Sequence, residues 1–221
     1  MIPLKDHNPS GSFPLVSYFL IGINVLVFFF SLALPEIELE GFINDYALIP
    51  ALIVQRRQLY SLLTSMFMHG GLGHLLSNML FLNIFGDNLE DKLGHFKYLF
   101  FYLFCGLGAS ALQIFVQPFS QIPNLGASGA IAGVMGGYLV LFPRHKIDIL
   151  FSLGWGLRQT TVPAYFMLFY WFGAQLLTGF GSLTYLDETM GGVAYFAHIG
   201  GFLTGWLLIR LLVRPSKLFR S

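Results

Sequence analysis

Two residues of this sequence carry the side chains needed for nucleophilic attack and lie in apolar surroundings. Ser128 falls in the segment Gly126–Gly129, which opens an apolar, glycine-rich run, and His198 falls in Ala197–Gly201, 70 positions later. A histidine that takes the proton of a serine hydroxyl makes that oxygen a nucleophile. Polar and ionisable groups are costly inside apolar segments, so their presence there indicates function. We interpret Ser128 and His198 as a candidate nucleophile and base.

Each of these residues also has an ordinary explanation. A serine at the start of a helix is often only its N-cap, and a histidine in an apolar helix can hydrogen-bond a neighbouring helix. Glycines favour proximity of the two runs: they recur at positions 129, 133 and 137 in the first and at 201 and 205 in the second. Small residues at this spacing let two helices approach closely. The glycines support proximity, not chemistry.

His74 and Asn78 form a second polar element. At i and i+4 of a helix they share one face, and both side chains can donate hydrogen bonds to a developing oxyanion. The N–H groups at the helix start near Ser128 can do the same. The alternative for His74 and Asn78 is a polar clamp between helices. We find no carboxylate suited to complete a triad with Ser128 and His198, so the sequence favours a dyad.

Composition places these residues in a membrane protein. The chain is 55% hydrophobic and 10% charged, with a mean hydropathy of +0.68, whereas soluble domains carry about 25% charged residues. A net charge of +1 gives no electrostatic case for binding nucleic acid. The single cysteine, Cys105, excludes a disulfide within the chain. We see no zinc motif or phosphate loop, and we expect no metal or cofactor.

Six segments are apolar enough to be membrane spans, which need about 20 mostly apolar residues. Proline ends the fourth run at Pro143, because it disfavours helix at the preceding residue. The predicted fold class is an all-α membrane protein with a bundle of six transmembrane helices. The six predicted spans are Phe13–Leu34, Gly73–Leu89, Gly94–Val116, Ser128–Phe142, Val162–Phe180 and Tyr195–Val213.

The basic residues set the predicted orientation. Arg56 and Arg57 fall on one side of the six-span arrangement, and the other ten lie opposite: Lys5, Lys92, Lys97, Arg144, Lys146, Arg158, Arg210, Arg214, Lys217 and Arg220. Basic residues favour the cytoplasmic side, so we expect both termini in the cytoplasm. The acidic residues Asp187 and Glu188 then lie in an external loop.

This orientation divides the chain into three parts. Residues 1–12 form a short cytoplasmic N-terminal segment, residues 13–213 a single membrane domain, and residues 214–221 a short basic cytoplasmic tail. The stretch Pro35–Leu72 is too long for a simple turn and only partly apolar. We expect it to be a first external loop that lies at the membrane interface.

The fourth span is short, which gives a depth for Ser128. Its 15 residues from Ser128 to Phe142 make about 22 Å of helix, at about 1.5 Å per residue, whereas the hydrocarbon layer is about 30 Å thick. If Pro143 marks the cytoplasmic surface, Ser128 lies several Å below the external one. The preceding segment Gln117–Ala127 must then dip into the protein, which predicts a hydrated pocket with Ser128 at its floor.

In order and spacing, these motifs resemble those of the rhomboid intramembrane serine proteases. The resemblance covers most of residues 60–207 and implies a rhomboid-like membrane domain. It implies that Ser128 is the nucleophile and His198 the general base, with an oxyanion hole from the Ser128 N–H, His74 and Asn78. The family cleaves transmembrane proteins near the outer membrane surface without metal or cofactor. The segments that carry the resemblance are Leu63–Gly71, His74–Asn78, Glu90–Gly94, Gly126–Gly129 and Ala197–Gly201.

Two positions depart from the family pattern. Many members carry a Trp-Arg pair in the first external loop, where this chain has Tyr60 and Ser61. Some members place an aromatic ring against the catalytic histidine, one turn after the serine, where this chain has Ala132. Neither change removes a catalytic atom, but another group must orient His198.

The resemblance also implies a membrane setting and partners. Transmembrane proteins would be the substrates and would enter laterally, past a gate that includes Trp171, Phe172 and Gln175 of the fifth span. We expect an integral, multi-pass protein of a prokaryotic plasma membrane. Two alternatives stay open: a proteolytically inactive relative that binds membrane clients, and a small transporter or channel with a polar site between its helices.

Overall fold

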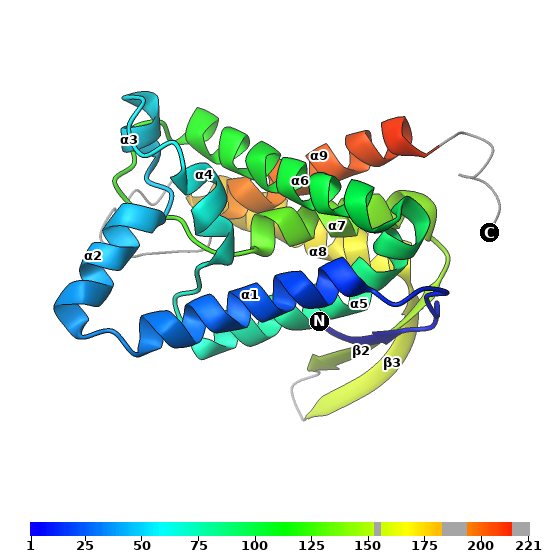
Figure 1. The fold of residues 1–221 in the computed structure, drawn as a ribbon. Coiled ribbons are helices and arrows are strands. Elements are labelled where there is room, and N and C mark those ends of the chain that lie inside the picture. The colour runs from blue at the N-terminus through cyan, green and yellow to red at the C-terminus, as the bar shows by residue number, and fades with distance from the viewer. Residues whose placement is uncertain (153–155, 183–193, 214–221) are drawn as a thin grey trace.

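The computed structural model describes residues 1–152, 156–182 and 194–213 of the chain (Figure 1). Six long helices match the six predicted runs, and the largest difference is at the end of the second, Leu93 rather than Leu89. The predicted loop residues Asp187 and Glu188, and the predicted tail at 214–221, lie outside the described residues. The six helices are α1 (Leu15–Leu32), α5 (Leu72–Leu93), α6 (His95–Val116), α7 (Ser128–Leu141), α8 (Ala164–Ser182) and α9 (Tyr195–Leu212).

Three of the described helices are long and apolar enough to cross a membrane. These are α1, α6 and α9, with 18, 22 and 18 residues. α7 is apolar but has only 14 residues, about 21 Å at about 1.5 Å per residue. It ends at Leu141, two residues before Pro143, as proline chemistry predicts.

Short helices fill the segment between α1 and α5. They are α2 (Glu36–Tyr46), α3 (Pro50–Val54), α4 (Ser61–Thr64) and a 3-10 turn at Ser65–Phe67. This segment carries the Tyr60–Ser61 departure: Ser61 is fully buried, and the Tyr60 ring lies 6.1 Å from that of Tyr46. At the position of the Trp-Arg pair, this segment therefore has a buried serine in place of the arginine.

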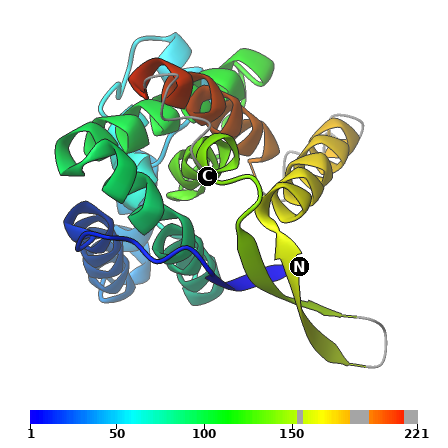
Figure 2. The same ribbon diagram turned by 90° about the vertical axis from the view of Figure 1, so that its right-hand side faces the viewer.

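A three-stranded antiparallel sheet corrects the all-α prediction, although the chain is mostly helical. Strand β1 (Ile2–Asp6) pairs with β2 (Lys146–Ser152), which pairs with β3 (Leu157–Pro163). The sheet borders the bundle where α7 ends and α8 begins, with β1 beside α5 (Figure 2). β2 buries alternate residues, Ile147 and Ile149, but such a short alternation is a weak signal, and its partner β1 lies more than 140 positions away.

α7 is the central helix of the bundle, and α8 is peripheral. Twelve of the 14 residues of α7 are buried, because α5, α6 and α9 enclose it (Figure 2). α8 packs on α9 and on part of α7, and its side chains Phe169, Tyr170 and Leu177 are exposed. The helix that begins with Ser128 is thus fixed on most sides, whereas α8 has one packed face.

Candidate active site

Ser128 and His198 are hydrogen-bonded. His198 Nε2 lies 2.8 Å from Ser128 Oγ, with Ser128 the first residue of α7 and His198 in the first turn of α9. His198 is 9% exposed. Ala127, not Ser128, occupies the N-cap position of α7, and no side chain caps this helix. The Ser128 hydroxyl therefore faces the imidazole of His198 instead of capping its own helix.

Glycine contacts between α7 and α9 bring the two residues together. A Cβ at Gly201 would collide with the carbonyl oxygen of Gly129, and one at Gly205 with that of Gly133. These contacts bear out the predicted close approach. Gly137 differs from the prediction: a Cβ there would meet Leu89 of α5 and Phe101 of α6, whereas Gly136 contacts α9. The contact with α9 moves from Gly133 to Gly136 because an α-helix has 3.6 residues per turn. Positions four residues apart therefore rotate gradually around the helix axis.

Gly126 makes the sharp turn that leads into α7. Its φ of +130° lies in a region that disfavours side chains, and its N–H donates to the Ser65 carbonyl at 2.9 Å. A Cβ at this position would lie 2.8 Å from His74 Nε2. The glycine thus lets the backbone just before Ser128 approach the His74 ring.

The loop before Ser128 is anchored by the segment after α2. Leu48 and Asn124 exchange two backbone hydrogen bonds of 2.9 and 2.8 Å, and Ala51 donates to Ser120 at 3.1 Å. Ala127 is fully buried. Part of the backbone of the Gln117–Ala127 segment is therefore hydrogen-bonded to other segments of the protein.

His74 and Asn78 share a cavity with Ser128 and His198. The cavity has a volume of about 980 Å³ and is lined by residues of α5, α7, α8 and α9, including Trp171. Asn78 Nδ2 donates to the His74 carbonyl oxygen at 2.8 Å, so its amide is turned back onto its own helix. His69 is buried and packs edge-on against the His74 ring, with centroids 5.0 Å apart. The four predicted site residues are thus brought to one place.

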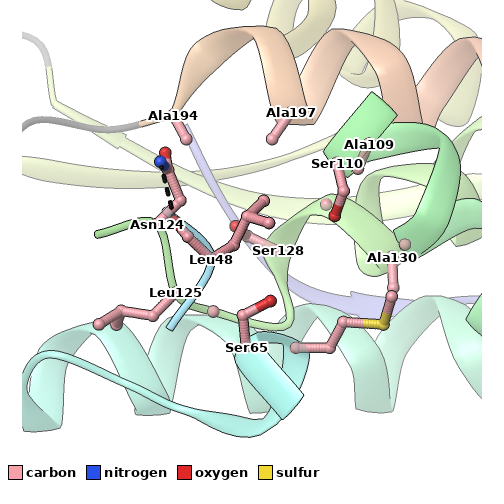
Figure 3. Close-up of a pocket in the computed structure, with 14 residues that line it drawn as sticks. Leu48, Ser65, Ala109, Ser110, Asn124, Leu125, Ser128, Ala130, Ala194 and Ala197 are labelled. Atoms are coloured by element: carbon pink, nitrogen blue, oxygen red, sulfur yellow. Dashed lines mark hydrogen bonds between the residues drawn. The ribbon is translucent and has the colours of Figure 1, made fainter. Parts of the chain in front are cut away.

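A second, smaller cavity of about 40 Å³ also has Ser128 in its lining (Figure 3). Polar side chains contribute to its lining: Ser65, Ser110 and Asn124 (Figure 3). A site of this size and polarity has room for water, which needs a volume of about 10–15 Å³. Ser128 lies on the boundary of both cavities.

α8 contributes two side chains next to His198 that sequence reasoning had given another role. Gln175 Oε1 lies 2.7 Å from His198 Nδ1, and the Trp171 ring lies 5.7 Å from the imidazole at an angle of 37°. The family resemblance implies that both belong to a lateral gate. Phe172, predicted with them, stacks on Phe202 of α9, with centroids 4.5 Å apart. The i, i+4 spacing of Trp171 and Gln175 was the available signal that both face one neighbour.

Within the described residues, the partner of His198 Nδ1 is this amide oxygen and not a carboxylate. In the same part of the chain, no group of three or more His, Cys, Asp or Glu side chains is arranged to hold a metal ion. The arrangement is a serine, an imidazole and an amide in line, beside a large cavity.

The fold and the site together define a class: a helical membrane protein with a serine–histidine pair on the wall of a cavity between its helices. The family model described as Rhomboid domain matches residues 56–215, and the chain belongs to the Rhomboid family. It is 33% identical to RHOMBOID-like protein 6, mitochondrial, of Arabidopsis thaliana over 167 residues. These residues are 75% of this chain and 48% of that protein.

Two other relatives give a similar picture. RHOMBOID-like protein 2 of Arabidopsis thaliana is 36% identical over 166 residues, which are 74% of this chain and 46% of the relative. Rhomboid protein 1, mitochondrial, of Saccharomyces cerevisiae is 31% identical over 195 residues, 86% and 51% of the two chains. This chain therefore spans about half the length of the curated relatives it matches.

Proposed function

We propose that this protein is an intramembrane serine endopeptidase that works through the dyad of Ser128 and His198. The observation that carries the proposal is the 2.8 Å contact between Ser128 Oγ and His198 Nε2. Membership of the Rhomboid family supports it. Both side chains line the large cavity, and His198 is buried, which agrees with a reaction that must be shielded from lipid but supplied with water.

The reaction proceeds by acyl transfer. Ser128 Oγ attacks the peptide carbonyl carbon while its proton passes to His198 Nε2. The tetrahedral intermediate collapses, the C–N bond breaks, and His198 returns the proton to the departing amine. Water then attacks the acyl carbon while its proton passes to His198. The bond from that carbon to Ser128 Oγ breaks, and His198 returns the proton to Oγ, which releases the acid product and restores Ser128.

The oxyanion of the intermediate needs donors that are already in position. We assign this role to the Ser128 N–H at the start of α7, to the His74 ring and to the Asn78 amide. The Asn78 amide donates to the His74 carbonyl in the resting protein, so it must rotate toward the substrate. The small cavity next to Ser128 has room for the water that hydrolyses the acyl-enzyme.

The proposed topology has six spans and both termini in the cytoplasm. The start of α7 then lies below the external surface, the loop helices α2, α3 and α4 lie at the interface, and residues 13–213 form the rhomboid-like membrane domain. Transmembrane proteins are the proposed substrates, cut near the external face. They enter from the bilayer past α8, with Trp171, Phe172 and Gln175 at the gate. Two relatives are named mitochondrial and another chloroplastic, so the comparisons do not support the expected prokaryotic plasma membrane.

The test is cleavage of a fluorescent transmembrane substrate by the purified protein in liposomes. We expect cleavage by wild type, none by Ser128→Ala or His198→Ala, and labelling of Ser128 by a fluorophosphonate. Equal cleavage by wild type and Ser128→Ala would overturn the mechanism. A folded wild type that binds the substrate but neither cleaves it nor takes the label indicates the client-binding alternative. Solute flux that does not depend on Ser128 indicates the transporter or channel.

A further inference from the structure

A line of three side chains from three helices ends at Ser128. Gln175 of α8 contacts His198 Nδ1 at 2.7 Å, and His198 Nε2 contacts Ser128 Oγ at 2.8 Å. We propose that Gln175 is the positioning residue of His198, which fixes the imidazole tautomer that can act as a base and ties that state to the packing of α8. This inference rests on the proposed dyad and adds a residue to it.

The tautomer follows from the chemistry of an amide oxygen. A neutral imidazole has one N–H donor and one acceptor nitrogen, and a carbonyl oxygen can only accept. With Gln175 Oε1 facing Nδ1, the proton resides on Nδ1 and the lone pair on Nε2 faces the Ser128 hydroxyl. Gln175 therefore orients the histidine as the carboxylate of a catalytic triad does, but it carries no negative charge. When His198 takes up the serine proton, both ring N–H groups have acceptors.

Trp171 completes the support. It precedes Gln175 by one helical turn, and its ring lies 5.7 Å from the imidazole. Ala132 offers no ring at the place where some family members have one, and it is fully buried in α7. The groups that orient His198 thus come from α8 instead of from the helix that carries the serine.

The position of α8 then decides whether His198 keeps the partner of its Nδ1. Its first turn is held by backbone hydrogen bonds from Ala164 to His145, 2.7 Å, and from Tyr165 to Pro143, 2.9 Å. Farther along, Leu177 is 80% exposed, and the Phe180 ring contacts that of Phe196 in α9, with centroids 6.1 Å apart. A displacement of this outer half away from α9 would separate Gln175 from His198. The ability of His198 to act as a base is thereby coupled to the packing of α8 against α9.

The test compares Gln175→Met, which keeps the length of the side chain but has no oxygen, with Gln175→Glu, which keeps an acceptor. Gln175→Met should lower kcat for the transmembrane substrate with KM unchanged. We expect a loss of about 10- to 100-fold, by analogy with removal of the hydrogen-bond partner of a metal-binding histidine. Gln175→Glu should recover most of the activity. Thr178→Val, one turn along α8 at an exposed hydroxyl that bonds Ala174, is the matched control and should match wild type.

A second readout needs no activity. In a ¹⁵N-histidine spectrum, the wild-type His198 signal should show a protonated Nδ1 and an unprotonated Nε2, and Gln175→Met should lose this preference. Wild-type kcat in Gln175→Met, or the opposite tautomer in the wild-type protein, overturns the inference. If the wild type shows the expected tautomer and neither cleaves nor takes the fluorophosphonate label, the proposed function fails while the positioning role of Gln175 stands.

Discussion

The backbones of Gly201 and Gly129 touch where α9 crosses α7: a Cβ at Gly201 would overlap the carbonyl oxygen of Gly129. Ser128 directly precedes Gly129, and His198 lies one turn before Gly201. The separation of the two helices at this crossing therefore sets the distance between the serine oxygen and the imidazole. Close packing of glycine against backbone therefore controls the geometry of the proposed catalytic pair.

Gly201→Ala should therefore impair both folding and cleavage. The added methyl group must push α9 from α7, and overpacking of this kind costs about 1–3 kcal/mol. We expect a lower unfolding temperature in detergent and a loss of fluorophosphonate labelling at Ser128. Gly22→Ala in α1, where no atom lies within 4 Å of the new Cβ, is the control and should keep both at wild-type level. Normal labelling of Gly201→Ala would contradict the role of this contact.

Asn78→Ala should slow the chemical step without unfolding the protein. Loss of one oxyanion donor lowers kcat about 10²- to 10³-fold. Ser77→Ala is a close control, because Ser77 Oγ contacts the same His74 carbonyl oxygen, at 3.0 Å, that accepts from Asn78 at 2.8 Å. Steady-state cleavage of the fluorescent substrate measures both variants. If Ser77→Ala loses as much activity as Asn78→Ala, the effect comes from the helix and not from the oxyanion.

Glu90→Ala should be the most destabilising of these substitutions. The Glu90 side chain is fully buried and accepts hydrogen bonds from the Val16 N–H, the Ser17 N–H and the Ser17 hydroxyl, each 2.8 Å long. Its removal leaves buried donors at the start of α1 without partners, which costs about 2–4 kcal/mol. Chemical unfolding in micelles measures this. Asp91→Ala, next in sequence, removes an acceptor for the exposed Ser12 and should change stability little.

Asp6→Asn should alter how stability depends on pH. Burial raises the pKa of the Asp6 carboxyl above its ordinary value of 3.8, against the opposing effect of hydrogen bonds such as that from Tyr138. The folded state thus holds this proton more tightly than the unfolded state, so the contribution of Asp6 to stability falls as pH rises from 3.8 through the raised pKa. Asparagine cannot ionise and keeps an acceptor oxygen for Tyr138.

The corresponding measurement is thermal unfolding of wild type and Asp6→Asn in micelles at pH 4 and pH 8. The unfolding temperature of Asp6→Asn relative to wild type should be higher at pH 8 than at pH 4. A difference that is the same at both values would show that Asp6 has an ordinary pKa in the folded protein.

The six long helices can be predicted from the sequence because the length of an apolar run is a local property of the chain. The predicted run at 128–142 and the helix Ser128–Leu141 begin at the same residue, since Gly126 and Pro143 mark its two ends. The sheet was not readable in this way. β1 and β2 hold each other through hydrogen bonds between residues more than 140 positions apart, such as the paired Asp6 and Ile147.

The sequence by itself determined which residues could react. A serine, two histidines and an asparagine in apolar segments can be recognised from their types and spacing, because polar groups in such surroundings are costly. Only the tertiary structure decided how His198 is oriented. Gln175 and Trp171 reach it from α8 across a helix–helix contact, and contacts between distant segments depend on packing that a local pattern of residues does not specify.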